Sequence, residues 1–466
     1  MKPSSWHRHH KWFGIVVCAF LVMFVLSGII LNHREQFADC DISRRYLPSR
    51  YEYDKWNGGL MRGSMAIGDD SVLIYGANGI WLFDRPSGQV GDFNSGLPEA
   101  ADSLNFRRIV KTRGGRLIAA STTGVYVLDK SKWNKRLSPV GKITDIEARG
   151  DSVVVLTRSN LYLDSGDGTF KRVELKASED STGMVSLFRT VWCLHSGELF
   201  GMGGRLFMDF IGLTLLFLCL SGIIVWLGKS SGLQRWSIKW HNKIGAVSIV
   251  FTLLMVVSGW CLRPPVMVPL ALTKTSPVPG TSLDSDNPWE DRLRAIRYDE
   301  GFGDWIISTS DGFFSLPDFS SSPRKLVATP PVSVMGINVW QKDSDGTWLC
   351  GSFSGMYRWN RRAALSTDYF SGEEVGDVSG PPFGKNAISG YSSDFGEAPL
   401  LVDYYEGTAL LPQSPALAQL PMSLWNLALE VHSGRIYIGA AATYVFIFFV
   451  GLAVSWCLFS GYKIRF

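Results

Sequence analysis

The sequence predicts a membrane-embedded bundle of four α-helical spans joined to an all-β, propeller-like domain on the outer side of the membrane. Three observations lead to this prediction. Four apolar runs are each long enough to cross a bilayer, which takes about 20 residues. The two long segments between them are rich in strand patterns, and the motifs around the first two runs recur around the last two. The chain is therefore expected to be a tandem repeat of one two-span unit, with the β domain built from two inserted segments.

The spans are expected where apolar residues run almost unbroken, at 12–31, 206–227, 244–262 and 436–459. The first run is expected to be an uncleaved anchor. Its apolar core is long, and it is followed by Asn32 and His33 where a signal peptide would have a small-residue cleavage site. Charged residues make up 19% and aromatic residues 13% of the chain, a composition typical of a protein that is partly membrane and partly soluble.

Lysine and arginine beside the spans predict the orientation, because they concentrate on the cytoplasmic side. Basic residues without acids occur in segment 1–11, in the link 228–243 and in the C-terminal tail. These parts are expected in the cytoplasm, with the two long segments and their β domain on the far side of the membrane. The lipid bilayer is then a partner, whereas nucleic acid is not, since no compact basic patch with interleaved aromatics occurs.

The expected division of the chain is span 1 at 1–33, the first β part at 34–185, spans 2 and 3 at 186–263, the second β part at 264–422 and span 4 at 423–466. In both β parts a β-branched strand, a tight turn and an aromatic-bearing strand recur. The turns are 45 and 36 residues apart in the first part and 43 apart in the second. Such periods are typical of propeller blades. We expect one composite propeller, with two separate β-sandwiches as the alternative.

The repeat is visible in the spacing of histidine, glycine and serine. The matched positions are His10, Gly14, Ser27 and Gly28 in span 1 with His241, Gly245, Ser258 and Gly259 in span 3, and His195, Gly212, Ser221 and Gly222 in span 2 with His432, Gly451, Ser460 and Gly461 in span 4. Both halves keep one orientation, which implies a pseudo-twofold axis along the membrane normal. His10 and His241 should then meet at the cytoplasmic end, and His195 and His432 at the outer end.

The chain has seven histidines, and none lies in 34–194 or 242–431. Histidine tolerates membrane interfaces, and this explanation suffices for His7 and His9. For the four repeat-matched histidines we expect a function, because ionisable residues at membrane depth are costly. Neighbours on a helix point about 100° apart, so only one of His9 and His10 can face the bundle, and the Gly14 register favours His10.

Two imidazoles from facing helices are the usual axial ligands of a b-type haem. A structural zinc site would need four ligands, and a proton relay would have only Asp209 as a buried acid. We therefore predict two bis-histidine haem b sites, one in each leaflet, with the small residues of the spans leaving room for the porphyrin. His33 has no repeat mate and is either an extra outer ligand or a substrate contact. Cys40 and Cys193 are candidates for a disulfide on the oxidising side.

These motifs resemble the PepSY-associated transmembrane helix family. The resemblance is carried by His10 to Gly14 with Ser27-Gly28 and Asn32-His33, by Leu194 to Gly197, by Ser221-Gly222 with Trp226, and by His241 to Gly245 with Ser258-Gly259. It covers the four spans and their flanks, roughly a third of the chain. Members of this family include inner-membrane siderophore reductases that bind two haems through histidines of the bundle. The resemblance thus implies as haem ligands His10, His33, His195, His241 and His432. No PepSY domain is recognised outside the membrane, where the blade-like repeats stand instead.

The leading prediction is a di-haem electron-transfer protein that reduces an extracytoplasmic ferric substrate for iron uptake. By resemblance the substrate is a ferric siderophore or chelate. The short inner segments carry no nucleotide-binding fingerprint, so the electron donor is expected to be a separate cytoplasmic protein or a quinol. The alternatives are a membrane-anchored β-propeller that senses a ligand or partner without redox activity, and a small-ion transporter or a haem or iron permease. The first lacks a sizeable cytoplasmic domain, and the second lacks polar residues within the spans.

Overall fold

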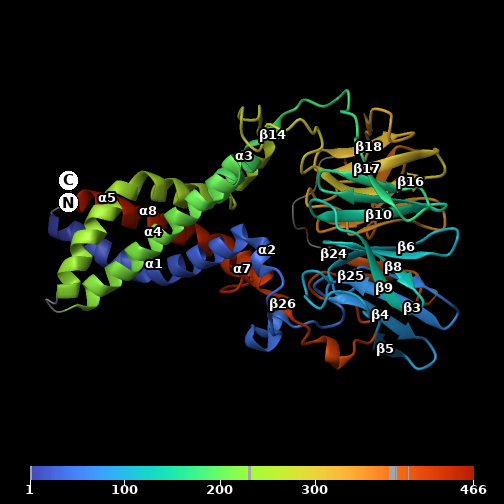
Figure 1. Ribbon diagram of the computed structural model, residues 1–466, viewed down its shortest axis with the longest axis horizontal. Helices are drawn as coiled ribbons and strands as arrows, with labels where there is room; N and C mark the ends of the chain where they lie inside the picture. Colours follow the sequence, from blue (N-terminus) through green and yellow to red (C-terminus); the bar gives the residue numbers. More distant parts are fainter. Residues whose placement is uncertain (1–2, 229–231, 377–383, 385, 397, 466) are drawn as a thin grey trace. The chain divides into compact units, whose positions relative to one another are not determined.

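The computed structural model describes residues 3–228, 232–376, 384, 386–396 and 398–465. The chain divides into two compact units, both drawn in Figure 1. The helical unit comprises Met1–Cys40, Thr182–Asp286 and Leu424–Phe466, and the β unit comprises Asp41–Ser181 and Asn287–Ser423. Each unit is therefore assembled from both halves of the chain.

Four long helices form the core of the helical unit: α1 (Pro3–Asn32), α4 (Gly201–Leu227), α5 (Gly232–Cys261) and α8 (Ala440–Arg465). Each is long and apolar enough to cross a membrane. Helix α1 packs against α4 and α8, and α5 packs against the same two helices, as the predicted repeat requires. Figure 1 shows that α1 begins and α8 ends at the same end of the bundle.

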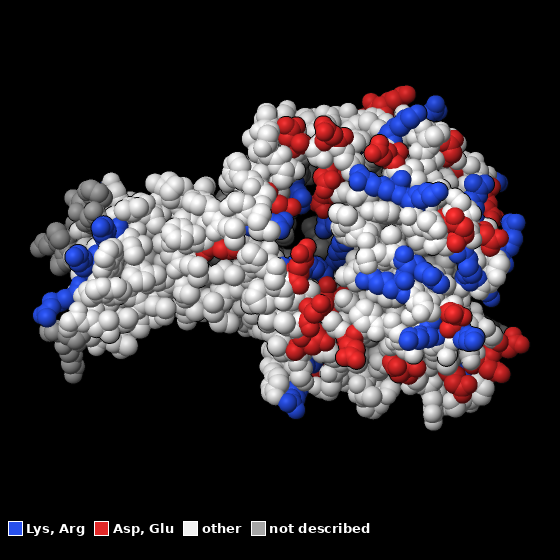
Figure 2. All heavy atoms as spheres, in the orientation of Figure 1, with Lys and Arg blue, Asp and Glu red and all other residues white. Residues whose placement is uncertain are grey.

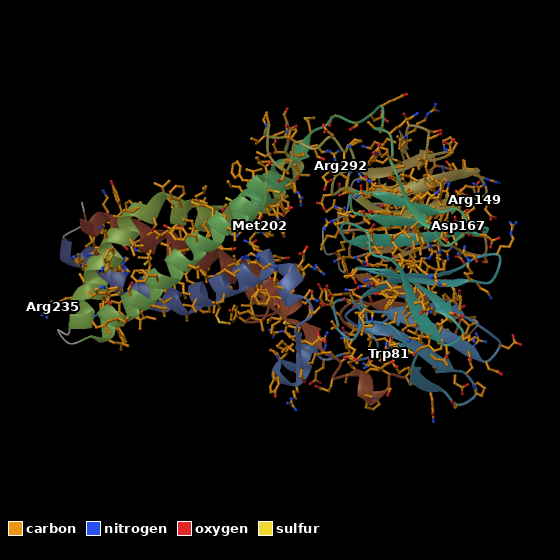
Figure 3. All side chains as sticks on the ribbon, in the orientation of Figure 1. Trp81, Arg149, Asp167, Met202, Arg235 and Arg292 are labelled. Atoms are coloured by element: carbon orange, nitrogen blue, oxygen red, sulfur yellow. The ribbon has the colours of Figure 1, made fainter. Side chains whose placement is uncertain are left out.

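The outer surface of these helices is apolar. Large side chains such as Phe210, Val247 and Phe449 are at least 60% exposed, as expected of helices that are surrounded by lipid. Figure 2 shows few charged residues along the visible side of the bundle, apart from lysines and arginines near the end where both chain termini lie. Arg235, labelled in Figure 3, lies at that end.

The fourth span is the one whose predicted start is wrong. It was expected from residue 436, but the candidate membrane helix runs over Ala442–Ile464. Gly434 has a φ of 80°, a left-handed conformation that ends helices readily, and residues 433–437 form a turn. The first two expected spans lie within α1 and α4, and the third ends one residue beyond α5.

A short helix precedes each of the second and fourth spans. Helix α3 (Leu187–Ser196) carries His195 and α7 (Leu424–His432) carries His432, each in its last turn. The Ser186 hydroxyl accepts the Arg189 N–H and caps α3 at its start. Gly197 ends α3 with a φ of 81°, and a Cβ there would lie 2.2 Å from the Gly204 carbonyl oxygen. Only glycine permits this sharp turn into α4.

The shorter elements of the helical unit are α2 (Arg34–Phe37), η3 (Glu198–Phe200), α6 (Met267–Leu272), and the paired strands β14 (Val185–Ser186) and β15 (Lys274–Thr275). Strand β15 and the hydrogen bond from Ser282 N to Leu199 O hold the chain after α5 in the helical unit. The β unit consequently resumes at Asn287, later than the expected boundary at 264. Cys40 and Cys193 are both free thiols, so the disulfide considered from the sequence is absent between these two described residues.

The β unit is made of small antiparallel sheets whose strands follow one another along the chain. Its first three four-stranded sheets are formed by β2 (Gly63–Ala66), β3 (Ser71–Gly76), β4 (Gly79–Asp84) and β5 (Gln89–Asp92), then β6 (Phe106–Lys111), β7 (Leu117–Ser121), β8 (Val125–Asp129) and β9 (Lys132–Leu137), then β10 (Ile143–Arg149), β11 (Ser152–Thr157), β12 (Leu161–Asp164) and β13 (Phe170–Val173).

The second half of the chain adds two further four-stranded sheets and one two-stranded sheet. They are formed by β16 (Leu293–Asp299), β17 (Asp304–Thr309), β18 (Gly312–Leu316) and β19 (Arg324–Lys325), then β20 (Val339–Lys342), β21 (Trp348–Ser352), β22 (Gly355–Asn360) and β23 (Leu365–Asp368), then β24 (Ile388–Ser392) and β25 (Leu400–Asp403). The remaining elements are η1 (Arg44–Tyr46), η2 (Ser49–Tyr51), η4 (Pro415–Leu417) and the paired strands β1 (Asp41–Ile42) and β26 (Met422–Ser423).

Six hydrophobic clusters join these sheets in sequence. Five of them each bridge one sheet and the next, from Leu73 and Ile109 between the first two sheets to Leu349 and Ile388 between the last two. The sixth cluster contains Trp81 of the first sheet, labelled in Figure 3, and Val402 of the last. Every sheet therefore buries apolar side chains against two others, so the core is distributed between the sheets.

Candidate functional site

The structure brings the repeat-matched histidines together in two pairs. His10 on α1 and His241 on α5 form the first histidine pair, with ring centroids 6.0 Å apart and ring planes at 75°. His195 on α3 and His432 on α7 form the second histidine pair, with centroids 6.1 Å apart and planes at 48°. The pairing in space is the one that the repeat predicted.

Each histidine ring is held by a Ser-Gly dipeptide on a different helix. The contacts between histidine Nδ1 and serine Oγ are His10 with Ser460 at 3.3 Å, His241 with Ser221 at 3.0 Å, His195 with Ser258 at 3.1 Å and His432 with Ser27 at 3.1 Å. The four Ser-Gly dipeptides of the spans are thus all used, one for each histidine.

A backbone carbonyl completes each Nδ1 contact. It belongs to the residue three positions before the serine: Cys457 at 3.0 Å from His10, Met255 at 3.1 Å from His195, Phe24 at 2.9 Å from His432 and Leu218 beside His241. A carbonyl oxygen can only accept, so Nδ1 carries the proton and donates. The serine hydroxyl in turn donates to its own helix, as Ser27 does to Met23 O at 2.6 Å.

This arrangement fixes the tautomer of the ring. In a neutral imidazole with the proton on Nδ1, the other nitrogen, Nε2, keeps a free lone pair. A hydrogen bond from Nδ1 to a carbonyl is the usual way in which proteins orient a metal-ligating histidine and raise its basicity. The Ser-Gly dipeptides and these carbonyls therefore orient the four rings and leave Nε2 as the unprotonated nitrogen of each.

The glycine of each dipeptide leaves space for the histidine ring. A Cβ built on the glycine would lie 2.7 Å from the His195 ring at Gly259, 3.0 Å from the His10 ring at Gly461, 3.2 Å from the His432 ring at Gly28 and 3.5 Å from the His241 ring at Gly222. A separation under 3.0 Å forces the ring to move, whereas 3.5 Å is ordinary van der Waals contact. The sequence prediction was that these glycines leave room for a porphyrin, and it missed that they make room for the histidine rings.

The second histidine pair is half-buried and lies close to the positive charge of Arg263. Burial lowers the pKa of His195 to about 4, with a contribution from Arg263, and burial lowers the pKa of His432 to about 3, with contributions from His195 and Arg263. Both rings are therefore neutral at pH 7, as a ligand must be. Arg263 follows the end of α5, four residues after Gly259, and burial lowers its own pKa to about 10. The sequence prediction did not include Arg263.

His33 belongs to neither pair. Its Nε2 lies 2.6 Å from Asp209 Oδ2 on α4, and the same carboxylate accepts the Asn32 amide at 3.0 Å. The Asn32 amide also donates to the carbonyl of Ser196, the residue after His195. His33 therefore forms a polar cluster in the helical unit, apart from the paired rings. The signal for this cluster was Asp209, the single acid within the second span.

His9 and His7 do not join the pairs either. His9 stacks on Phe13 and contacts Trp456 edge-on, and His7 is exposed. His10, as the Gly14 register indicated, is the residue that faces His241.

The geometry of the pairs fits a single metal between two imidazoles. Two nitrogens at about 2 Å from one ion place the ring centroids about 6 Å apart, close to the observed 6.0 and 6.1 Å. Within the described residues, no three His, Cys, Asp or Glu side chains gather as a metal site. Two protein ligands suffice only where a macrocycle supplies the other four, so the residues fit a haem better than a zinc ion.

The fold and the site define a multi-pass membrane protein with two cradled histidine pairs and a separate β domain. The model of the PepSY-associated TM region matches residues 2–229 and 155–465. The chain belongs to this family, as its motifs indicated. No curated protein sequence matches it.

Three solved structures have a distant similarity to this chain. The extracellular domain of BT4673 from B. thetaiotaomicron, described as a one-component system, has a TM-score of 0.36 and 10% identity, covering 81% of this chain and 39% of that one. An ancestral GH74 enzyme has a TM-score of 0.34 and 6% identity, covering 75% and 35%. The N-terminal domain of Nup159 has a TM-score of 0.32 and 10% identity, covering 79% and 92%. This chain thus spans well under half the length of the first two.

Proposed function

We propose that this protein is a di-haem b electron carrier of the bacterial inner membrane that reduces a ferric chelate on the periplasmic side. The observation that carries the proposal is the set of four histidines, paired about 6 Å apart, each with Nδ1 bonded and Nε2 free. His10 and His241 would hold one haem, and His195 and His432 the other.

A bound haem supplies one-electron chemistry, which no side chain of the spans provides. The chain's own residues would bind and orient it. The Ser-Gly dipeptides fix each imidazole plane, and the apolar helices exclude water. Arg263 would attract a carboxylate side chain of the cofactor at the second pair and favour the reduced state through its positive charge. His33 and Asp209 form a hydrogen-bonded acid–base pair nearby in the same helical unit.

The orientation is part of the proposal. Basic residues flank the ends of α1, α4, α5 and α8 where the termini lie, which favours a cytoplasmic location for that end. The β unit would then be periplasmic. We also propose that its six sheets are the blades of one propeller, supported by the cyclic order of the six hydrophobic clusters.

The substrate follows from the family and from the side on which the second pair would lie. A ferric siderophore or other ferric chelate is the acceptor we favour, because reduction to ferrous iron weakens its binding to hard oxygen ligands. A cytoplasmic protein or a quinol would donate the electrons at the first pair.

The test uses full-length protein purified in detergent from haem-replete cells. We expect a haem-to-protein ratio near two, a reduced spectrum of low-spin haem b, and re-oxidation of the reduced protein by an added ferric siderophore. Colourless protein would overturn the haem assignment and favour the sensor. Coloured protein that no ferric chelate re-oxidises would overturn the reductase alone.

A further inference from the structure

The β unit contains a cavity of about 370 Å³ whose walls come from the first strands of five sheets. Strand β2 contributes Ser64, β6 contributes Arg107 and Arg108, and β16 contributes Arg297, while β20 and β24 supply further lining residues. Arg62, just before β2, completes a group of four arginines. Because four guanidinium groups surround one polar cavity, the net charge of its lining decides which ligands it can bind.

Two of the four arginines are neutralised by acids of β10. Arg108 forms a salt bridge with Glu147, and Arg297 forms one with Asp145. These pairs are almost fully enclosed, with side-chain exposures of 24% or less. They anchor the wall of the cavity.

Among the residues that the structure describes, neutral oxygens hold the Arg62 guanidinium. Its Nη1 donates to Asn105 Oδ1 at 2.6 Å and to the Phe106 carbonyl. Burial, and then the charge of the neighbouring Arg107, lower the pKa of Arg62 to about 9. Among the described residues, Asp394 is the one acid that lines the cavity, and it accepts a hydrogen bond from Ser64. A guanidinium buried beside a second cation is costly unless an anion compensates it.

Trp340 carries a buried donor without a partner in the described part of the chain, and its ring packs against Phe313 and Trp348. The residue lines the cavity and is 3% exposed, and its indole Nε1 is buried with no hydrogen-bond partner among the residues described. A buried donor that is left unsatisfied costs about 1–3 kcal/mol. Tyr75 also lines the cavity, and its hydroxyl is accommodated because Gly63 has no Cβ, which would lie 2.3 Å from it.

We propose that this cavity binds a small organic anion bearing two or more carboxylates, either free or as a ferric chelate. Arginine forks match carboxylates in planar, two-point hydrogen bonds, and Tyr75 adds a hydroxyl to the lining. The cavity volume of about 370 Å³ is many times the roughly 30 Å³ that one water occupies, and it exceeds what a single inorganic phosphate fills. The aromatic side chains of the lining can pack against an organic skeleton. Binding of the anion stands on the cavity alone, whereas its identity as the reducible chelate rests on the proposed function.

The experiment is isothermal titration of the full-length protein in detergent with citrate, ferric citrate and phosphate. We expect saturable binding of citrate, ferric citrate or both, and weaker binding of phosphate. Binding of ferric citrate without citrate identifies the chelate as the ligand, and citrate alone identifies the free acid. Equal or tighter binding of phosphate would overturn the carboxylate assignment, and absence of binding by all three would overturn the site.

Two variants tie the binding to the cavity. Arg62→Gln should weaken the bound carboxylate at least tenfold through loss of a charge-assisted hydrogen bond. Since Arg62 also bridges β2 to Asn105, Tyr75→Phe serves as a second variant, because it keeps the ring and deletes only the hydroxyl; it should weaken binding several-fold. Arg136→Gln on β9, an exposed arginine outside the cavity, is the matched control and should bind as wild type. Wild-type affinity in both cavity variants would overturn the proposal.

Haem content is measured in the same samples, which separates the two proposals. Protein without haem that binds citrate would contradict the electron-transfer function and support the anion site. Protein with two haems that binds none of the three anions would do the reverse.

Discussion

In both histidine pairs a Ser-Gly dipeptide holds each ring, but the histidines of the two pairs lie on different kinds of helix. In the first pair, His10 and His241 lie within the long helices α1 and α5. In the second, His195 and His432 lie in the last turns of the short helices α3 and α7, just before glycines in the left-handed conformation. In both pairs a serine hydroxyl and the carbonyl three residues before it hold Nδ1.

The two pairs differ in the space between each glycine and its histidine ring, and in the charge nearby. The closest approach of a glycine to a histidine ring is at Gly259 in the second pair, and the loosest is at Gly222 in the first. Arg263 acts on both rings of the second pair. The repeated motif therefore fixes the position of each histidine ring, whereas the residues around the two pairs differ. The two sites should therefore be similar in ligation and different in potential.

The largest effect should come from removing one ligand of each pair. His241→Ala should abolish the haem of the first pair and His432→Ala that of the second, so each variant should retain one haem per chain. Pyridine haemochrome assays on purified protein give the ratio, and His9→Ala is the control that should retain two. Loss of both haems from either folded variant would show that the sites are not separate.

A smaller but more selective effect is expected at the glycines. Gly259→Ala should place a Cβ 2.7 Å from the His195 ring and displace it, whereas Gly222→Ala should place one at 3.5 Å from His241 and be tolerated. Disturbing the support of a ligand typically costs 10–100-fold in metal affinity. We expect that loss in a haem titration of the Gly259 variant at the second pair only. Equal losses of haem affinity in the two variants would contradict the claim that Gly259 makes room for the His195 ring.

Removing the charge beside the second pair should change a potential rather than occupancy. Arg263→Gln should lower the midpoint potential of the second site, because a positive charge nearby favours the reduced form. A shift on the order of 50 mV corresponds to about 1 kcal/mol for one electron. A redox titration followed by absorbance resolves two components, and the first site is the internal control. Parallel shifts of both components, or none, would disprove the assignment of Arg263.

The smallest effect is expected at the serines. Ser258→Ala removes the hydroxyl from His195 but leaves the Met255 carbonyl at 3.1 Å. A hydrogen bond of this kind contributes about 1 kcal/mol, so haem affinity should fall by about fivefold or less. Ser221→Ala should behave alike at the first pair, since Leu218 remains there. A loss of haem comparable to that of His432→Ala would mean that the hydroxyl, and not the carbonyl, orients the ring.

The sequence predicted what depends on periodicity and recurrence. Apolar length located the four helices, and the repeat alone indicated that His10 meets His241 and that His195 meets His432. It also distinguished His10 from His9 by helical register. These features are local or follow from symmetry, so a linear pattern records them.

The sequence could not predict which helix holds each histidine ring, because those contacts depend on how the helices pack in three dimensions. The Ser-Gly dipeptides lie from 20 to 450 residues along the chain from their histidines, so spacing gives no partner for them. The same holds for His33 and Asp209, which are 176 residues apart. The start of the fourth span was missed because the apolar run continues through the turn after Gly434, where backbone conformation overrides hydrophobicity.

The most direct test of the central claim is an electron paramagnetic resonance spectrum of the oxidised, full-length protein. Two paired histidine seats with free Nε2 atoms predict two low-spin ferric haem signals of bis-histidine type, with one missing in His241→Ala and the other missing in His432→Ala. A purified, folded protein that shows no haem signal, or a single signal that both variants retain, would contradict the account.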